Sequence, residues 1–227
     1  MTFDGKNERL VPLSARPRSR PGPEGGKRDS NRRRRLAALQ DAALELFLHK
    51  GVEGTTIAEI TAGANTAKGS FYRYFQDKAD LVEALFTPLS HTMEEAFKEA
   101  GENLAKVSSA EELLKAYNIL GMRVAPGVLQ HPKIVLLYLQ ESRGASTPSR
   151  RAIETLREGI DANAIKLTHA AHRHGLWRSF PAQISAYAVV GAVEKSLFSL
   201  LRSEANINPA EWTRSLISLI LDGLAPR

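Results

Sequence analysis

Apolar residues recur at the spacing of an α-helix from about Arg33 almost to the end of this 227-residue chain. Leu36, Leu39, Ala43 and Phe47, for example, fall on one helical face. We find no convincing strand pattern, no internal repeat and no heptad run. The sequence therefore predicts an all-α fold with about nine helices.

Residues that start and stop helices punctuate this pattern. Thr56-Ile57-Ala58-Glu59 is a capping box, in which the Thr hydroxyl and the Glu carboxylate each satisfy a free backbone N–H. Gly51 suits the end of the preceding helix. Further helix starts are predicted at Asp77, Ser109, Pro132, Pro148, Pro181 and Asn208-Pro209. Pro88 falls inside the helix that follows Asp77, and its missing N–H predicts a kink there.

The helices between residues 33 and 75 are short and have the order of a helix-turn-helix. A supporting helix is followed by a short helix from Thr56, a turn near Asn65 and a second short helix from about Ala67 to Phe75. Asparagine is the best residue other than glycine for the left-handed backbone of such a turn. The second short helix is therefore the predicted recognition helix, which would lie in the major groove of DNA.

The residues of this stretch resemble the DNA-binding domain of the TetR family. The resemblance rests on Ala42-Ala43, Leu46-Phe47, Gly51, Gly54-Thr55-Thr56-Ile57-Ala58-Glu59-Ile60, Lys68-Gly69-Ser70-Phe71-Tyr72-Arg73-Tyr74-Phe75, Lys78 and Leu81. It covers about 50 residues, and the spacing matches without a gap. It implies a helix-turn-helix domain over residues 32–80 and a larger ligand-binding and dimerisation domain over residues 81–227. The chain departs from the family at Asn65, where a glycine is usual, and at Ala67, where a serine is usual.

The predicted DNA contacts follow partly from geometry and partly from the resemblance. Lys68 and Arg73 can donate to guanine O6 and N7, Ser70 can read several base edges, and Gly69 lets the backbone approach DNA. The resemblance implies phosphate contacts from Tyr72 and Lys78, with Thr56 as a third and Tyr74 as a further one. Phe71 and Phe75 lie four residues apart and are assigned to the core. Ala67 cannot cap the recognition helix, which removes about 1 kcal/mol of stabilisation.

The positive charge of the chain is concentrated at its start. Residues 1–35 hold 11 Lys and Arg against 4 acids, a balance of 11 − 4 = +7, whereas the whole chain is +6. Residues 1–31 lack apolar periodicity, so we predict a disordered basic arm there. We predict DNA contact for Arg32–Arg35, which directly precede the helix-turn-helix.

The resemblance also implies functions for the remainder of the chain. The helices after residue 79 should bind a small-molecule effector, with candidate lining residues Phe86, Tyr117, Met122, Tyr138, Glu141, Ile165 and His169. The last two predicted helices, over about 181–203 and 209–224, should form a homodimer interface through Ala188, Gly191, Ala192, Ser196, Trp212, Leu216 and Ile220. The helix that contains Pro88 should link the effector pocket to the recognition helices, either as a hinge or as a kink without a regulatory role.

Taken together, the sequence predicts a cytoplasmic, ligand-released repressor that binds a palindromic operator as a homodimer. The alternative is a helical protein that binds a small molecule, lipid or protein without specific DNA recognition. We predict no enzyme activity, because Gly63–Ser70 has the order Lys-Gly-Ser and not the Gly-Lys-Ser of a phosphate loop, and no nucleophile elbow occurs. No cofactor, metal site or membrane association is expected, since the chain has no cysteine and lacks an uninterrupted apolar run of spanning length.

Overall fold

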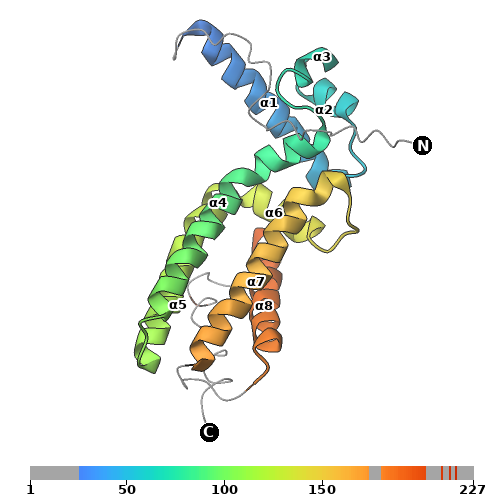
Figure 1. Ribbon diagram of the computed structural model, residues 1–227. Coiled ribbons are helices and arrows are strands. Elements are labelled where there is room, and N and C mark those ends of the chain that lie inside the picture. Colours follow the sequence, from blue (N-terminus) through green and yellow to red (C-terminus); the bar gives the residue numbers. More distant parts are fainter. Residues whose placement is uncertain (1–25, 174–179, 203–210, 212–214, 216–217, 219–227) are drawn as a thin grey trace, which may run out of the picture.

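The structure is a computed structural model that describes residues 26–173, 180–202, 211, 215 and 218 (Figure 1). Within these residues all regular structure is helical, which confirms the predicted all-α class. The elements are α1 (Lys27–Lys50), α2 (Ile57–Gly63), α3 (Lys68–Phe71), α4 (Lys78–Leu104), α5 (Ala110–Gln130), α6 (Pro132–Glu141), the 3₁₀ helix η1 (Pro148–Arg150), α7 (Arg151–Arg173) and α8 (Ala182–Leu201).

The first three helices form a small unit at one end of the molecule (Figure 1). Its core consists of buried side chains from each helix, namely Leu39, Ala43 and Phe47 of α1, Ile60 of α2 and Phe71 of α3, with Phe75 behind them. This core continues without a break into Leu81, Val82, Leu85 and Phe86 of α4 and into Ile134 and Leu137 of α6. The helix-turn-helix is therefore fixed against the remainder of the chain by packing.

The long helices α4, α5, α7 and α8 run away from this unit as a bundle (Figure 1). α4 packs against both α5 and α7, and α7 packs against α8. A second apolar cluster lies far from the first and joins α4, α5 and α7 through Ala100, Leu104, Val107, Leu113, Ala116, Leu167, Ala170 and Ala171.

Local capping signals specify the helix ends as predicted. The Thr56 hydroxyl accepts the Glu59 N–H while the Glu59 carboxylate accepts the Thr56 N–H, which completes the capping box of α2. Asp77 caps α4 by accepting the Asp80 N–H at 2.9 Å, and Ser109 caps α5 by accepting the Glu112 N–H at 3.2 Å. Pro132 opens α6, where a missing N–H has no cost.

Helix α1 begins earlier than predicted. It starts at Lys27, and the prediction of an unstructured arm is therefore wrong for residues 27–31. The physical reason is local, since Lys and Arg favour helices and Asp29 in the first turn pairs with Arg33 at 3.0 Å. Residues 1–25 of the predicted arm lie outside the described residues.

The recognition helix is shorter than predicted. α3 ends at Phe71 and not near Phe75. Beyond Phe71 the chain tightens, because the Arg73 and Tyr74 N–H groups donate to carbonyls three residues back instead of four. The Phe75 N–H still reaches the Phe71 carbonyl at 3.0 Å, so residues 72–75 stay coiled against α3.

Two further predictions concern helix continuity. α4 runs through Pro88 without ending, and its axis changes direction along its length (Figure 1). The proline therefore does not break the helix, and a bend is the usual consequence of its missing N–H. The last predicted helix, over about 209–224, lies largely outside the described residues, and so do its predicted interface residues Trp212, Leu216 and Ile220.

Candidate DNA-binding surface and its link to the helical bundle

The turn between α2 and α3 has the backbone that its sequence predicts. Asn65 has a φ of 48°, which is the left-handed region. Its N–H donates to the Ala62 carbonyl at 3.0 Å, and the Thr66 N–H donates to the Thr61 carbonyl at 2.9 Å. These bonds close the end of α2 and aim the chain into α3. Asn65 thus supplies the left-handed turn residue that the sequence predicted.

α3 separates anchoring residues from exposed ones. Phe71 and Phe75 are 0% and 4% exposed, and their ring centroids lie 5.5 Å apart. Lys68, Gly69 and Arg73 are exposed, and the Tyr72 ring is 52% exposed although its edge contacts Phe71. The two phenylalanines therefore hold α3 in place, and Lys68, Tyr72 and Arg73 around them stay open to a partner.

The exposed polar groups of α3 are partly ordered before any partner binds. The Arg73 guanidinium donates to the Ser70 hydroxyl at 2.8 Å, which places both side chains together. A Cβ at Gly69 would meet nothing within 4 Å, so packing does not require glycine there. The backbone at Gly69 is therefore open to the approach of another molecule.

Thr56 and Tyr74 are engaged within the chain. The Thr56 hydroxyl donates to Glu59 Oε2 at 2.7 Å in addition to its capping bond. Glu59 also pairs with Lys50, and this bond together with those from Thr56 lowers the pKa of Glu59 to about 2. Tyr74 is half-buried against the apolar core. Both residues are thus bound into the fold of the helix-turn-helix.

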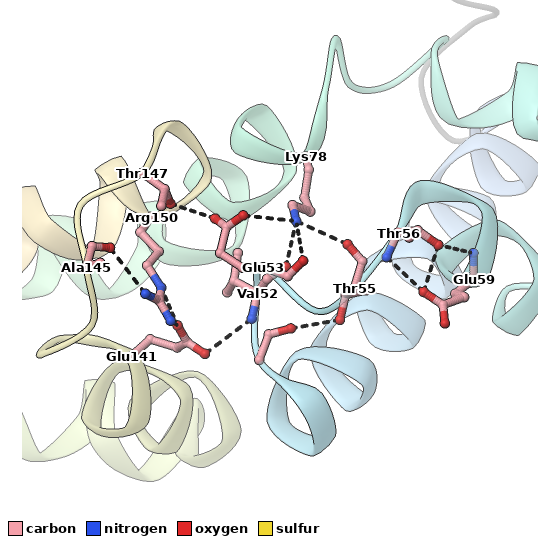
Figure 2. Close-up of polar contacts among 11 residues, drawn as sticks. Val52, Glu53, Thr55, Thr56, Glu59, Lys78, Glu141, Ala145, Thr147 and Arg150 are labelled. Carbon is pink, nitrogen blue, oxygen red and sulfur yellow. Dashed lines mark hydrogen bonds and ion pairs between the residues drawn. The ribbon is translucent and has the colours of Figure 1, made fainter.

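Lys78 has a structural position that the sequence did not indicate. Its ammonium group donates to the Val52 carbonyl at 2.7 Å, the Thr55 carbonyl at 3.1 Å and the Glu53 carbonyl at 3.4 Å (Figure 2). The three N–H donors of a lysine are thereby occupied. Lys78 therefore ties the start of α4 to the loop 51–55, which leads into α2.

Glu141, which was predicted to line an effector pocket, is a buried residue that links α6 to the same loop. Its Oε1 accepts the Val52 N–H at 3.2 Å, and its Oε2 accepts the Arg150 Nε–H at 2.5 Å (Figure 2). Gly51 has a φ of 81°, and a Cβ there would lie 3.0 Å from Glu141 Oε1. The position of the helix-turn-helix therefore depends on a carboxylate from the helical bundle.

A second tie lies beside the first. The Thr147 hydroxyl donates to Glu53 Oε1 at 2.6 Å, and Glu53 Oε2 lies 3.8 Å from Lys78 Nζ (Figure 2). Thr147 precedes η1, which opens α7. Two carboxylates, Glu53 and Glu141, thus connect the loop 51–55 to the segment between α6 and α7.

The described cavity differs from the predicted effector pocket. It has a volume of about 810 Å³ and lies between α4 and the η1–α7 segment. Phe86 is the one predicted pocket residue that lines it, and the other lining residues include Glu83, His91, Glu94, Thr147 and Arg151. Both apolar and polar side chains line this cleft, and its wall includes Thr147, the residue that bonds Glu53.

The other predicted pocket residues are scattered. Met122 is 74% exposed and His169 is also exposed, so both lie on the surface. Tyr117 packs against the second apolar cluster, and burial raises its pKa. Buried Tyr138 donates to Glu194 Oε1 of α8 at 2.8 Å, and half-buried Ile165 lies on α7. The sequence identified apolar and aromatic positions without showing which of them face one another. Among the described residues, no group of three His, Cys, Asp or Glu side chains could hold a metal ion.

Among the described residues, α8 is an apolar helix of which only Ala182, Ser185 and Ala186 are buried. Ala188 is exposed, whereas Gly191, Ala192 and Ser196 are half-buried, and the Ser196 hydroxyl donates to the Ala192 carbonyl. By length and composition alone α8 could cross a membrane, with a mean hydropathy of 1.4 over 18 residues, of which 11% are buried. Since an interface helix has the same composition, this property does not indicate a membrane span by itself.

Comparisons with known proteins agree with this geometry. Residues 39–85 match the family described as "Bacterial regulatory proteins, tetR family". The chain is 31% identical over 163 residues to the transcriptional regulator TcmR of Streptomyces glaucescens, a match that covers 64% of this chain and 70% of TcmR. It is 34% identical over 76 residues to the regulator TtgR of Pseudomonas putida, where the match covers 34% of this chain and only 32% of TtgR.

Solved structures share the fold across nearly their whole length. NalD of Pseudomonas aeruginosa, described as the secondary repressor of the MexAB-OprM efflux pump, has a TM-score of 0.65 at 19% identity, with 86% of this chain and 98% of NalD covered. FadR of Bacillus subtilis, solved with stearoyl-CoA, has a TM-score of 0.58 at 16% identity, with 83% and 98% covered. Together with the helix-turn-helix anchored by Phe71 and Phe75 and the match to most of TcmR, these findings establish that the chain belongs to the TetR family of DNA-binding transcriptional regulators.

Proposed function

We propose that the protein is a homodimeric repressor that binds a palindromic DNA operator and leaves it when a small-molecule effector binds the helical bundle. The observation that carries this proposal is that Lys68 of α3 and Arg73 just beyond it are exposed and Ser70 is half-buried, while Phe71 is fully buried as an anchor. A recognition helix needs such a face, because its side chains must reach base edges in the major groove.

The residues of this surface have different functions in the proposed complex. Lys68 and Arg73 donate to guanine, Ser70 contacts a neighbouring base edge, Gly69 allows close approach and Tyr72 contacts a phosphate. Thr56, Tyr74 and Lys78, which the resemblance suggested as phosphate contacts, act instead by positioning α2 and α3. Their engagement with Glu59, the core and the loop 51–55 supports this assignment.

The homodimer forms through α8 in this proposal. Ala188, Gly191, Ala192 and Ser196 lie on an apolar helix that is largely accessible in the described part of the chain. Small residues let a partner helix approach closely, and a twofold axis pairs two recognition helices with the two halves of a palindrome.

Effector control is supported by the structural relatives. FadR was solved with stearoyl-CoA, and the regulator AibR was solved with isovaleryl coenzyme A and operator DNA. We propose that this chain likewise responds to a small organic molecule in the cytoplasm. Release requires that the effector favour one placement of the helix-turn-helix over another, since a ligand of equal affinity for both shifts nothing.

The decisive experiment is selection of duplexes from random DNA by the full chain, followed by affinity measurements on the selected and scrambled duplexes. The selected duplexes should contain an inverted repeat. Arg73→Ala should lower discrimination by about 1–3 kcal/mol at one position of each half-site. The matched control is Arg123→Ala on α5, which removes the same charge from a surface pair with Glu99. Equal affinity of the wild type for both duplexes would contradict the proposal.

A further inference from the structure

The first nine residues of α1 carry the densest charge of the described chain. Residues 27–35, here called the basic extension, contain six Lys and Arg and one acid, a balance of 6 − 1 = +5. Residues 36–227 hold 31 − 11 = 20 basic and 25 − 4 = 21 acidic residues, a balance of −1. The basic extension is therefore a local feature against a nearly neutral protein.

Packing does not explain the basic extension. All six of its basic side chains are exposed, and the side chains of Arg32 and Arg33 are 55% and 65% exposed. Leu36 is the first residue of α1 in contact with the apolar core, and Leu39 is the first fully buried one. Asp29 in this segment is buried, but no residue before Leu36 belongs to the apolar core, so that core does not account for the six exposed basic side chains.

The basic extension places its positive charge on the same side of the molecule as α3. The N-terminal end of α1 and α3 lie at the same end of the molecule, away from the turn between α4 and α5 (Figure 1). At about 1.5 Å per residue, nine helical residues reach roughly 13 Å past Leu36. That distance corresponds to about four base pairs at 3.4 Å each.

We infer that the basic extension binds the phosphate backbone of duplex DNA flanking the bases read by α3, and thereby lengthens the bound site by about four base pairs on each side. This inference rests on the proposed function. Guanidinium groups suit phosphate oxygens because their planar N–H donors can bind two oxygens at once. A helical extension also has less conformational entropy to lose on binding than a disordered arm would have.

The internal partners of the extension indicate which residues to test. Asp29 pairs with Arg32 at 3.6 Å and with Arg33 at 3.0 Å, which partly neutralises those two residues. Arg34 donates to the neutral Asn31 side chain at 3.3 Å and keeps its full charge. Arg34 and Arg35 are therefore the better test residues, and glutamine at both positions preserves helix propensity.

The experiment measures DNA affinity of the full chain against salt concentration. In R34Q/R35Q, the slope of log K against log[salt] should be less steep by roughly 0.9 for each phosphate that a bound subunit no longer neutralises. The base preference of the selected site should not change. Trimming the duplex flanks should reduce wild-type affinity to that of the variant while leaving the variant's affinity almost unchanged.

The matched control is K98Q/K106Q, which removes two exposed charges at the opposite end of α4 and just beyond it. Its slope should stay close to the wild-type value. A wild-type slope in R34Q/R35Q, or an equal change in both variants, would overturn the inference. The proposed function fails separately, if the wild type does not prefer its selected duplex to a scrambled one. Because phosphate contacts are independent of sequence, the slopes on the scrambled duplex would still decide whether the extension binds DNA.

Discussion

The buried carboxylate of Glu141 accepts the backbone N–H of Val52 at 3.2 Å, across 89 residues of chain. Its other oxygen accepts the Arg150 guanidinium, so one side chain of α6 is shared between the helix-turn-helix and the start of α7. A carboxylate that is 7% exposed is tolerable only because both oxygens have partners. The relation between the two parts of the protein is therefore sensitive to this residue.

Replacing Glu141 by alanine should destabilise the protein strongly. The change leaves the Val52 N–H and the largely buried Arg150 guanidinium without their acceptor. We expect a loss of about 3 kcal/mol in the free energy of unfolding, measured by urea denaturation. Glu141→Gln should lose less, because its amide oxygen can still accept one of the two donors.

The control for this prediction is the exposed pair of Lys133 and Glu45, which also joins α6 to α1. Both side chains are more than half exposed, so Lys133→Ala should change the free energy of unfolding by less than about 1 kcal/mol. Similar losses from Glu141→Ala and Lys133→Ala would show that burial of the Glu141 carboxylate does not govern its contribution.

Lys78→Met tests whether Lys78 positions the helix-turn-helix or contacts a DNA phosphate. The variant keeps the aliphatic stem but loses the three bonds to the carbonyls of the loop 51–55. We expect weaker binding to the selected duplex with an unchanged slope of log K against log[salt]. A slope less steep by about 0.9 per subunit would instead identify Lys78 as a phosphate contact.

Ala67→Ser should stabilise the recognition helix. α3 begins at Lys68 with Ala67 in the cap position, where no side chain accepts a hydrogen bond. A serine there can accept a free N–H of the first turn, which is worth about 1 kcal/mol. The measurement is thermal unfolding beside Ala67→Gly, which offers no hydroxyl. An unfolding temperature for Ala67→Ser at or below that of the wild type would contradict the prediction.

The sequence predicted the structural features that depend on residues close together in the chain. The caps at Thr56, Asp77 and Ser109 and the left-handed turn at Asn65 each involve partners within four residues. The burial of Phe71 and Phe75 follows from their spacing. Such features depend on backbone geometry that every helix shares, and the structure confirms them.

Contacts between residues far apart in the sequence could not be predicted from spacing and capping patterns. Lys78 bonds carbonyls 23 to 26 residues earlier, and Glu141 bonds an amide 89 residues earlier. Neither partner has a side-chain signature, because backbone groups occur at every position. A glutamate at the end of the apolar helix α6 signals that it has a partner, but it does not say whether the partner is a ligand or the chain itself.

Gly191→Glu tests the homodimer through α8. A Cβ at Gly191 meets nothing within 4 Å among the described residues, so a monomer should accommodate glutamate. In a tightly packed dimer the same change places an unpaired charge in the interface and should favour monomers. Light scattering over a dilution series should show the loss of the dimer.

Gly121→Glu is the matched control for this test. Gly121 lies on α5, and a Cβ there also meets nothing within 4 Å. The dimer should persist in this variant. A monomeric wild type, or an unchanged dimer in Gly191→Glu, would count against α8 as the interface.

Pro88→Ala tests whether the bend in α4 sets the position of the helix-turn-helix. The proline ring removes the N–H that would otherwise bond the Ala84 carbonyl, although α4 continues to Leu104. Alanine restores that donor, so α4 should straighten and move Lys78 relative to Glu53 and Thr147. Since the chain has no cysteine, spin labels at Glu83→Cys and Glu95→Cys can report this change as a longer separation.

A straighter α4 should lower affinity for the selected duplex severalfold, because the recognition helices are displaced from their half-site spacing. Thr87→Ala is the control, since it removes only a side-chain bond to the Glu83 carbonyl in the same turn and leaves the backbone unchanged. If the label separation lengthens in Pro88→Ala while operator affinity stays at the wild-type value, the bend has no influence on DNA binding. The proline would then be a tolerated kink, and the coupling between bundle and helix-turn-helix would rest on the shared apolar core and on the contacts of Glu53, Lys78 and Glu141.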